Sequence, residues 1–179
     1  MDENQQPNYI FLDTEADRQN LIDDIAKIHN AIEAHVKTIP EQDWYTPRYH
    51  GWSLGAMLGH LNLIDNLALL QIQIALIGFA PPVSMNTVNG FNDFMARVFQ
   101  RRLVETSLRG MRNNETRIAD FIMRLPMDKL SSQVYSPSLA KQQTIERYIQ
   151  DNFLFHWQYH LQTMREQEGV QPPERPDTV

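Results

Sequence analysis

The 179-residue chain contains no cysteine, and this absence excludes several kinds of chemistry. Without a thiol, the chain forms no disulfide, offers no thiolate nucleophile and holds no cysteine-ligated iron–sulfur cluster. Any transition-metal site must therefore be built from nitrogen and oxygen donors, and six histidines are available to supply nitrogen. The lack of cysteine also fits a reducing compartment.

Glycine, basic residues and a targeting segment are scarce or missing as well. Seven glycines and few alternating β-branched runs argue against a sheet. Sixteen Lys and Arg stand against 22 Asp and Glu, for a formal net charge of −6, which disfavours nucleic acid as a partner because phosphate binding needs a basic face. The acidic, polar start at residues 1–5 has neither the basic nor the apolar segment of a secretory signal, so we expect a cytoplasmic protein.

A long uninterrupted apolar run is missing too, although residues 53–79 come close to one. Polar residues break this stretch well short of the ~20 apolar residues that a bilayer requires: Asn62, Asp65, Asn66, Gln71 and Gln73. We therefore expect no membrane span. A helix that is apolar nearly all round is central to a bundle or packs against a second subunit, which predicts a homodimer.

Helical periodicity dominates what is present. Residues 13–37 carry one apolar stripe with spacings of three and four, which predicts an amphipathic helix capped by Asp13 or Thr14 and ended before Pro40: Leu21, Ile25, Ile28, Ile32 and Val36. Residues 39–51 read as an aromatic-rich loop. Ser53 then caps a second helix that reaches about residue 79.

Two further helices complete the prediction. The third begins at Asn89 or Asn92 and runs to residue 125, and the fourth begins between residues 141 and 144 and runs to residue 168, with Gly169 just beyond it. We therefore predict an all-α domain over residues 13–168, preceded by a loosely held lead-in at 1–12 and followed by a tail at 169–179. Because the connections of about 10–15 residues exceed what a minimal bundle needs, a four-helix bundle with a crossover connection is expected.

The pair His156 and His160 is the main candidate for chemistry. Histidines four residues apart lie on one helix face, with Cβ atoms about 5–6 Å apart, so both imidazoles reach one divalent ion. His60 on the second helix supplies a third donor, and three imidazoles leave coordination positions open for water or substrate. Gly55 and Gly59 would permit a close approach beside His60, and Asn152 could orient a ligand or bind the ion itself. The spacing alone is also typical of ordinary surface or core histidines.

The other candidate residues have simpler interpretations. We expect His29 and His35 to be solvated, and His50 to be a loop histidine at the surface or at a pocket entrance. The arginines of the third helix form a solvated face by default, although Arg97 or Arg101 could hold a substrate carboxylate. Ser53 is a cap rather than a nucleophile, because no histidine–acid pair is arranged to activate it.

Two short motifs carry a family resemblance: Trp52-Ser53-Leu54-Gly55-(x)4-His60-Leu61, and, about 95 residues later, His156-(x)3-His160-Leu161-Gln162-(x)2-Arg165. In these residues the chain resembles the DinB-like superfamily, which includes bacillithiol- and mycothiol-dependent transferases. The resemblance covers the chain from the first helix to about Arg165. It implies a four-helix bundle with a crossover, often dimeric, and a metal triad formed by His60, His156 and His160.

The resemblance favours a metal-dependent enzyme that acts on a small-molecule substrate. The reaction is either hydrolysis or the transfer of a low-molecular-weight thiol, which must be a free cosubstrate because the chain has no cysteine. Zinc, nickel and iron(II) all accept imidazole, so the metal stays open, and no side chain is assigned as the general base. The alternative is a non-catalytic bundle that binds a small ligand or serves as a stress-response interaction protein.

Overall fold

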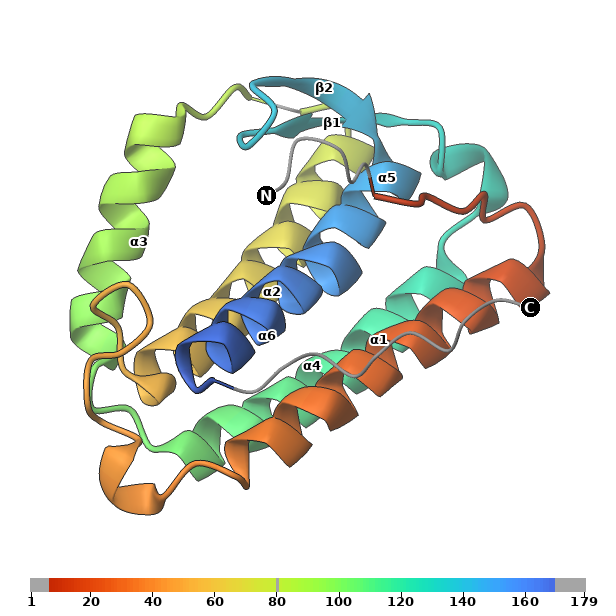
Figure 1. Ribbon diagram of the computed structural model, residues 1–179. Helices are drawn as coiled ribbons and strands as arrows, with labels where there is room; N and C mark the ends of the chain where they lie inside the picture. The colour runs from red at the N-terminus through yellow and green to blue at the C-terminus, as the bar shows by residue number, and fades with distance from the viewer. Residues whose placement is uncertain (1–6, 80, 170–179) are drawn as a thin grey trace.

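Two pairs of long helices form the body of the protein (Figure 1). The computed structural model describes residues 7–79 and 81–169. In it, α1 (Glu15–Val36) packs along α4 (Val104–Arg124), and α2 (Leu54–Leu76) lies beside α6 (His156–Gln167). Because α2 also packs on α4 and α1 on α6, the pairs enclose one shared interior. The predicted all-α four-helix bundle is confirmed.

The fourth bundle helix changes its winding midway. It starts as α5 (Ile145–Gln150), continues through a π-helical segment (Asp151–Phe155) and ends as α6 at Gln167. Single π-turns inside α-helices occur frequently at functional sites. Here the π-helical segment ends immediately before His156, so it determines the direction in which the first histidine of the pair points.

Helix α1 forms for the reasons that its sequence suggests. Thr14 is the N-cap in a capping box with Asp17: its hydroxyl accepts the Asp17 amide hydrogen and its own amide donates to the Asp17 carboxylate. The predicted stripe faces the interior, and Leu21, Ile25 and Ile32 are fully buried. These contacts place α1 against the helices that carry the site.

The described part of the predicted lead-in, residues 7–12, is held more tightly than expected. Gln150 of α5 exchanges two hydrogen bonds with the backbone of Ile10, and the Leu12 amide donates to the carboxylate of Glu146. The Leu12 side chain is fully buried. This segment therefore packs along the fourth helix.

The predicted third helix is wrong in its start and its continuity. The chain instead forms α3 (Met85–Phe99), a bend, and α4. Gln100 stabilises the bend because its side chain accepts the Ser53 amide hydrogen while its backbone carbonyl accepts the Ser53 hydroxyl. Helix α3 carries the chain back along the bundle, so α2 and α4 run in the same direction, and α3 is the expected crossover (Figure 1).

The expectation of no sheet is also wrong in one place. Strands β1 (Gln133–Ser136) and β2 (Lys141–Thr144) form an antiparallel hairpin within the predicted loop and at the predicted helix start. Val134 is fully buried in the core, and the Thr144 hydroxyl caps α5 by accepting the Arg147 amide hydrogen. Two four-residue strands are too short for a clear alternating pattern, and tertiary packing stabilises them.

As predicted, other parts of the chain approach the backbone of α2 closely at Gly55 and Gly59. A Cβ atom at Gly55 would overlap the backbone carbonyl of Arg102, and one at Gly59 would lie 2.8 Å from the Phe99 ring. The bend between α3 and α4 therefore packs directly on the backbone of α2.

Gly55→Ala is expected to destabilise the fold by about 1–3 kcal/mol, because a backbone carbonyl must move to admit the methyl group. Gly90→Ala is the matched control: Gly90 lies on exposed α3 with nothing within 4 Å of the added Cβ, so alanine should stabilise by up to about 1 kcal/mol. Urea unfolding of both variants measures the difference. Equal stability of the two variants would contradict this account of the bend.

Within the described residues, no helix is long and apolar enough to cross a membrane. Large apolar side chains are nevertheless exposed on the second half of α2 and on α3, among them Leu70, Ile77, Phe94 and Val98. The homodimer stays a prediction.

Candidate metal centre

The three predicted histidines meet at one point between α2 and α6. The Nε2 atom of His156 lies 3.4 Å from Nε2 of His60 and 3.0 Å from Nε2 of His160. All three donor nitrogens lie within 4.8 Å of one another. His60 is buried and the other two are half-buried, so the cluster lies below the surface with one open side.

The spacing of these nitrogens fits a shared metal ion. An ion bound tetrahedrally at about 2.0–2.1 Å holds its nitrogen ligands about 3.3 Å apart. The second nitrogen of each ring, Nδ1, is buried and has no hydrogen-bond partner among the described residues. A neutral imidazole has one N–H, so the rings either crowd hydrogens at the centre or leave buried Nδ1–H groups unpaired. A cation at the centre would be bound by three lone pairs and would remove the crowding, and the single N–H of each ring would then lie on its Nδ1 atom.

Burial keeps all three rings in the form that binds metal. It lowers the pKa of His60 to about 4. Burial, with the neighbouring histidines adding to it, lowers the pKa of His160 to about 3 and that of His156 well below its ordinary value. The imidazoles are therefore neutral at neutral pH, and a metal ion displaces no proton from them.

A large cavity of about 1020 Å³ opens from the three histidines. Helix α2 lines one wall from His60 to Ile74, and α3 lines the facing wall with residues such as Val88 and Phe91. Trp52 covers the histidine end, with its ring centroid 5.0 Å from that of His60 in an edge-on contact. The site thus combines a nitrogen cluster with a mostly apolar chamber, the usual composition of a small-molecule site.

Comparison with known proteins supports the fold. No family model matches the chain, and no curated protein matches it by sequence. A solved structure of YfiT from Bacillus subtilis, described as a probable metal-dependent hydrolase with an unusual four-helix bundle topology, matches with a TM-score of 0.69 at 14% identity, over 93% of this chain and 95% of that chain. The colibactin self-resistance protein ClbS, solved in complex with double-stranded DNA, matches with a TM-score of 0.69 at 16% identity, over 87% of this chain and 97% of that chain. The chain has the DinB-like fold.

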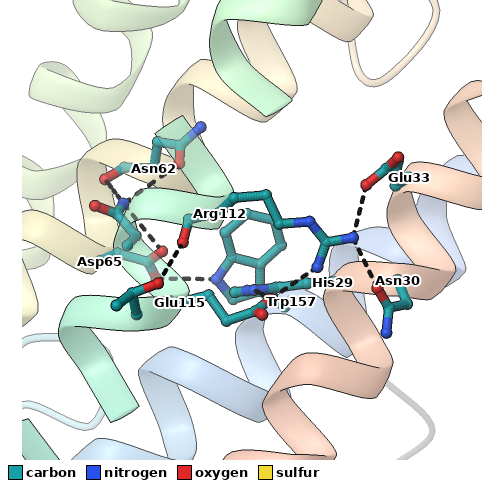
Figure 2. A network of polar contacts seen from close by, with 10 residues as sticks. His29, Asn30, Glu33, Asn62, Asp65, Arg112, Glu115 and Trp157 are labelled. Atoms are coloured by element: carbon teal, nitrogen blue, oxygen red, sulfur yellow. Dashed lines mark hydrogen bonds and ion pairs between the residues drawn. The ribbon is translucent and has the colours of Figure 1, made fainter. Parts of the chain in front are cut away.

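A buried polar network joins α2, α4 and α6 around Trp157, the residue after His156 (Figure 2). The Asp65 carboxylate on α2 is fully buried and accepts a 2.9 Å hydrogen bond from the indole of Trp157, the residue after His156. Asn114 of α4 donates to the same carboxylate. Burial raises the pKa of Asp65 to about 7, while these hydrogen bonds act in the opposite direction. The network joins α2 to α6 beside the site.

The prediction that His29 and His35 are solvated is wrong. His29 is fully buried against the Trp157 ring, and its Nδ1 atom lies 2.9 Å from the Glu115 carboxylate of α4. His35 is 5% exposed. Both belong to the α1 face that packs on α4 and α6, a face wider than its apolar stripe. Their charged sequence neighbours point elsewhere and gave no signal of this.

The remaining predicted residues lie around the three-histidine cluster rather than in it. His50 is exposed in a tight turn and lines a smaller pocket of about 520 Å³ with Arg97, whereas Arg101 lines neither pocket. Asn152 lies on the wall of the large cavity and donates to the Tyr148 carbonyl. Ser53 is an N-cap, as predicted, because its hydroxyl accepts the Ala56 amide hydrogen.

Sequence reasoning missed the partnership of Asp65 and Trp157. In the sequence, Asp65 only interrupts an apolar stretch, and Trp157 only lies between the two histidines of the candidate pair. A lone acid on an otherwise apolar helix, one and a half turns after His60, is the signal that was present, because such an acid needs a buried donor.

Proposed function

We propose that His60, His156 and His160 hold one divalent transition-metal ion and that the protein is a metal-dependent enzyme acting on a small molecule. The observation that carries this proposal is the convergence of three neutral Nε2 atoms at separations of 3.0 and 3.4 Å beside a large cavity. Three protein ligands leave a coordination position open, which is typical of catalytic rather than structural sites.

Hydrolysis is the reaction that we propose first, and transfer of a free thiol is the second. The description of YfiT as a probable metal-dependent hydrolase supports this order. When bound, a divalent ion lowers the pKa of a coordinated water or thiol and so supplies a nucleophile at neutral pH. Zinc, nickel and iron(II) stay candidates, because imidazole suits all three.

The chain's own residues contribute position and surroundings. Trp157, anchored by Asp65, fixes the start of α6 and with it the direction of His156. Trp52 closes the histidine end of the cavity, so a substrate must enter along α2 and α3. Apolar walls exclude water from the substrate and strengthen electrostatic contacts inside the chamber. No side chain is assigned as general base.

Nucleic acid is not the partner that we propose, although ClbS was solved with double-stranded DNA. Two of the four arginines of α4 already pair with carboxylates in this chain: Arg112 bonds to Glu33 and Glu115, and Arg124 pairs with Asp120. The net charge of −6 also opposes an approach to phosphates. A gel-shift assay with duplex DNA at low salt checks this, and salt-sensitive binding would contradict it.

The enzymatic proposal is tested by metal analysis and by turnover. The purified protein is stripped with chelator, reloaded with zinc, nickel or iron(II), and assayed against p-nitrophenyl esters and against monochlorobimane with added thiols. We expect activity only in a reloaded sample, and its loss in His156→Ala. His50→Ala, which changes an exposed histidine outside the cluster, should retain about one metal ion per chain. Full activity in His156→Ala would overturn the proposal.

A further inference from the structure

The cavity that opens from the histidines is long rather than round. Along α2, His60 is the first residue that lines it and Ile74 is the last. At 1.5 Å per residue these two positions lie about 20 Å apart, and Ser136 and Ser138 of the hairpin line it as well. A volume of about 1020 Å³ is at the upper end of the range for small-molecule sites. The chamber therefore fits an elongated ligand that reaches the histidines with one end.

The walls of this cavity are mostly apolar and partly open to solvent. Leu67, Leu70 and Phe91 line it, yet each side chain is between 38% and 50% exposed. Exposed apolar surface of this kind marks a place where an apolar partner binds. The depth of the chamber and the histidines at one end indicate a small molecule as that partner.

The charges on the wall have one sign. Among the described residues, no lysine or arginine lines the cavity, whereas Asp151 does, as does the exposed Asp93, which also borders the smaller pocket beside Arg97. Asp151 is occupied by hydrogen bonds from Tyr9 and Gln143. Asp93 has no hydrogen bond or ion pair with any described residue, and it lies on α3 facing α2. Away from the histidines, an anionic group would meet two carboxylates and no cationic side chain among the described residues, with only neutral amide and hydroxyl groups as donors.

The side chain of Asn92, which also lines the cavity, lacks a hydrogen-bond donor for its oxygen within the described part of the chain. The side-chain oxygen of Asn92, next to Asp93, is buried and accepts no hydrogen bond from the described residues. A buried acceptor without a partner costs free energy, unlike an acceptor that is exposed to water. Asn92 and Asp93 together present acceptors to whatever fills the chamber.

We propose that the cavity binds an elongated apolar amine, whose nitrogen donates to Asn92 and Asp93 while its far end reaches the histidines. This rests on the proposed function only in taking the cavity as the substrate chamber. It narrows the substrate class: phosphorylated and polycarboxylate compounds, including strongly anionic thiols, are excluded from the chamber. The amine serves as the recognition group, and the reacting bond belongs to the end beside the metal site.

The test uses the metal-free protein, so that it does not depend on the metal chemistry. The neutral fluorophore N-phenyl-1-naphthylamine reports occupancy of the cavity, and n-decylamine and n-decanoate, equal in chain length and opposite in charge, compete with it. We expect the amine to displace the probe at about a tenfold lower concentration than the carboxylate. Val88→Trp, which places a bulky indole on the chamber wall, should weaken probe binding.

Two matched charge reversals test whether Asp93 is the group that makes the cavity prefer the amine to the carboxylate. Asp93→Lys should remove or invert the preference for decylamine, whereas Asp120→Lys, an equal charge change on α4 outside the cavity, should keep it. Circular dichroism and the melting temperature verify that each variant is folded. Equal displacement by the two competitors, or equal behaviour of the two lysine variants, would overturn the proposal.

Further outcomes of these experiments also test the proposed ligand class. Probe binding with an unchanged dissociation constant in Val88→Trp would mean that the probe binds outside the chamber, and the proposal would be wrong. A chamber covered by a second copy of the chain would leave the probe unbound at concentrations where the protein is dimeric, and this would overturn it too. A protein that binds no metal but still prefers decylamine would refute the proposed function while the ligand class stands.

Discussion

Zinc at a thousand times its dissociation constant is expected to raise the free energy of unfolding by about 4 kcal/mol, and His156→Ala is expected to remove that increment. His156 is the middle member of the cluster, since its Nε2 atom is the one within 3.4 Å of both other histidines. For a domain of this size the increment corresponds to a rise of about 8–16 °C in melting temperature. Differential scanning calorimetry with chelator and with added zinc measures it.

His50→Ala provides the control for this experiment, because it deletes a histidine that lies outside the cluster. It should show the full zinc-dependent rise. A melting temperature that is the same with chelator and with zinc in the unmodified protein would favour the non-catalytic ligand-binding bundle. A zinc-dependent rise in melting temperature that persists in His156→Ala would mean that zinc binds outside the three-histidine cluster.

Trp157→Phe is expected to destabilise the protein by about 2–3 kcal/mol, more at pH 8 than at pH 5. The substitution keeps an aromatic ring in the core but removes the indole N–H that the buried Asp65 carboxylate accepts. That hydrogen bond lowers the pKa of Asp65 against the stronger effect of burial, which raises it to about 7. Loss of the donor therefore costs most where Asp65 is ionised.

The sign of the Asp65 contribution follows from proton uptake. The unfolded chain loses the Asp65 proton near its ordinary pKa of 3.8, whereas the folded chain keeps it until about pH 7. Between these values the folded state binds more protons, so stability falls as pH rises and is level above that range. Asp65→Asn removes the effect, and the difference between the two proteins should change by about 4 kcal/mol across the range.

Urea unfolding of four proteins at pH 5 and pH 8 separates these effects: the unmodified chain, Trp157→Phe, Asp65→Asn and the double variant. In the asparagine background, Trp157→Phe should cost only its lost packing and should cost the same at both pH values. The titration of the buried histidines is common to all four proteins and cancels in the differences. If Trp157→Phe lowers the free energy of unfolding equally at pH 5 and pH 8 in the Asp65 background, the proposed dependence on the charge of Asp65 is wrong.

Much of the bundle was predictable because the signals are local. The α1 stripe, the Ser53 cap and the apolar length of α2 each depend on residues within a few turns of one another, and the structure confirms them. His60, His156 and His160 could be selected because four-residue spacing on one helix and a family motif on another both refer to short segments. Their convergence between α2 and α6 follows from helix packing.

The predictions that were wrong, on the third helix and on His29, share a different cause. Nothing near Gln100 breaks a helix by propensity, and the bend is stabilised by Ser53, far away in sequence, which donates two hydrogen bonds to Gln100. His29 was predicted to be solvated because its neighbours are charged, yet it is buried against Trp157 from another helix. In each case a contact between distant segments outweighed the local preference.

The sequence by itself selected the three histidines that we propose as metal ligands, limited any transition-metal donors to nitrogen and oxygen, and indicated that helices carry the histidines, because residue type and periodicity are local properties. Only the tertiary structure decided that α3 separates from α4 and forms the wall of a cavity, since that wall depends on a bend made by long-range hydrogen bonds. It also decided the charge of that wall, because the bend brings Asp93 to the chamber beside α2 and directs the arginines of α4 elsewhere.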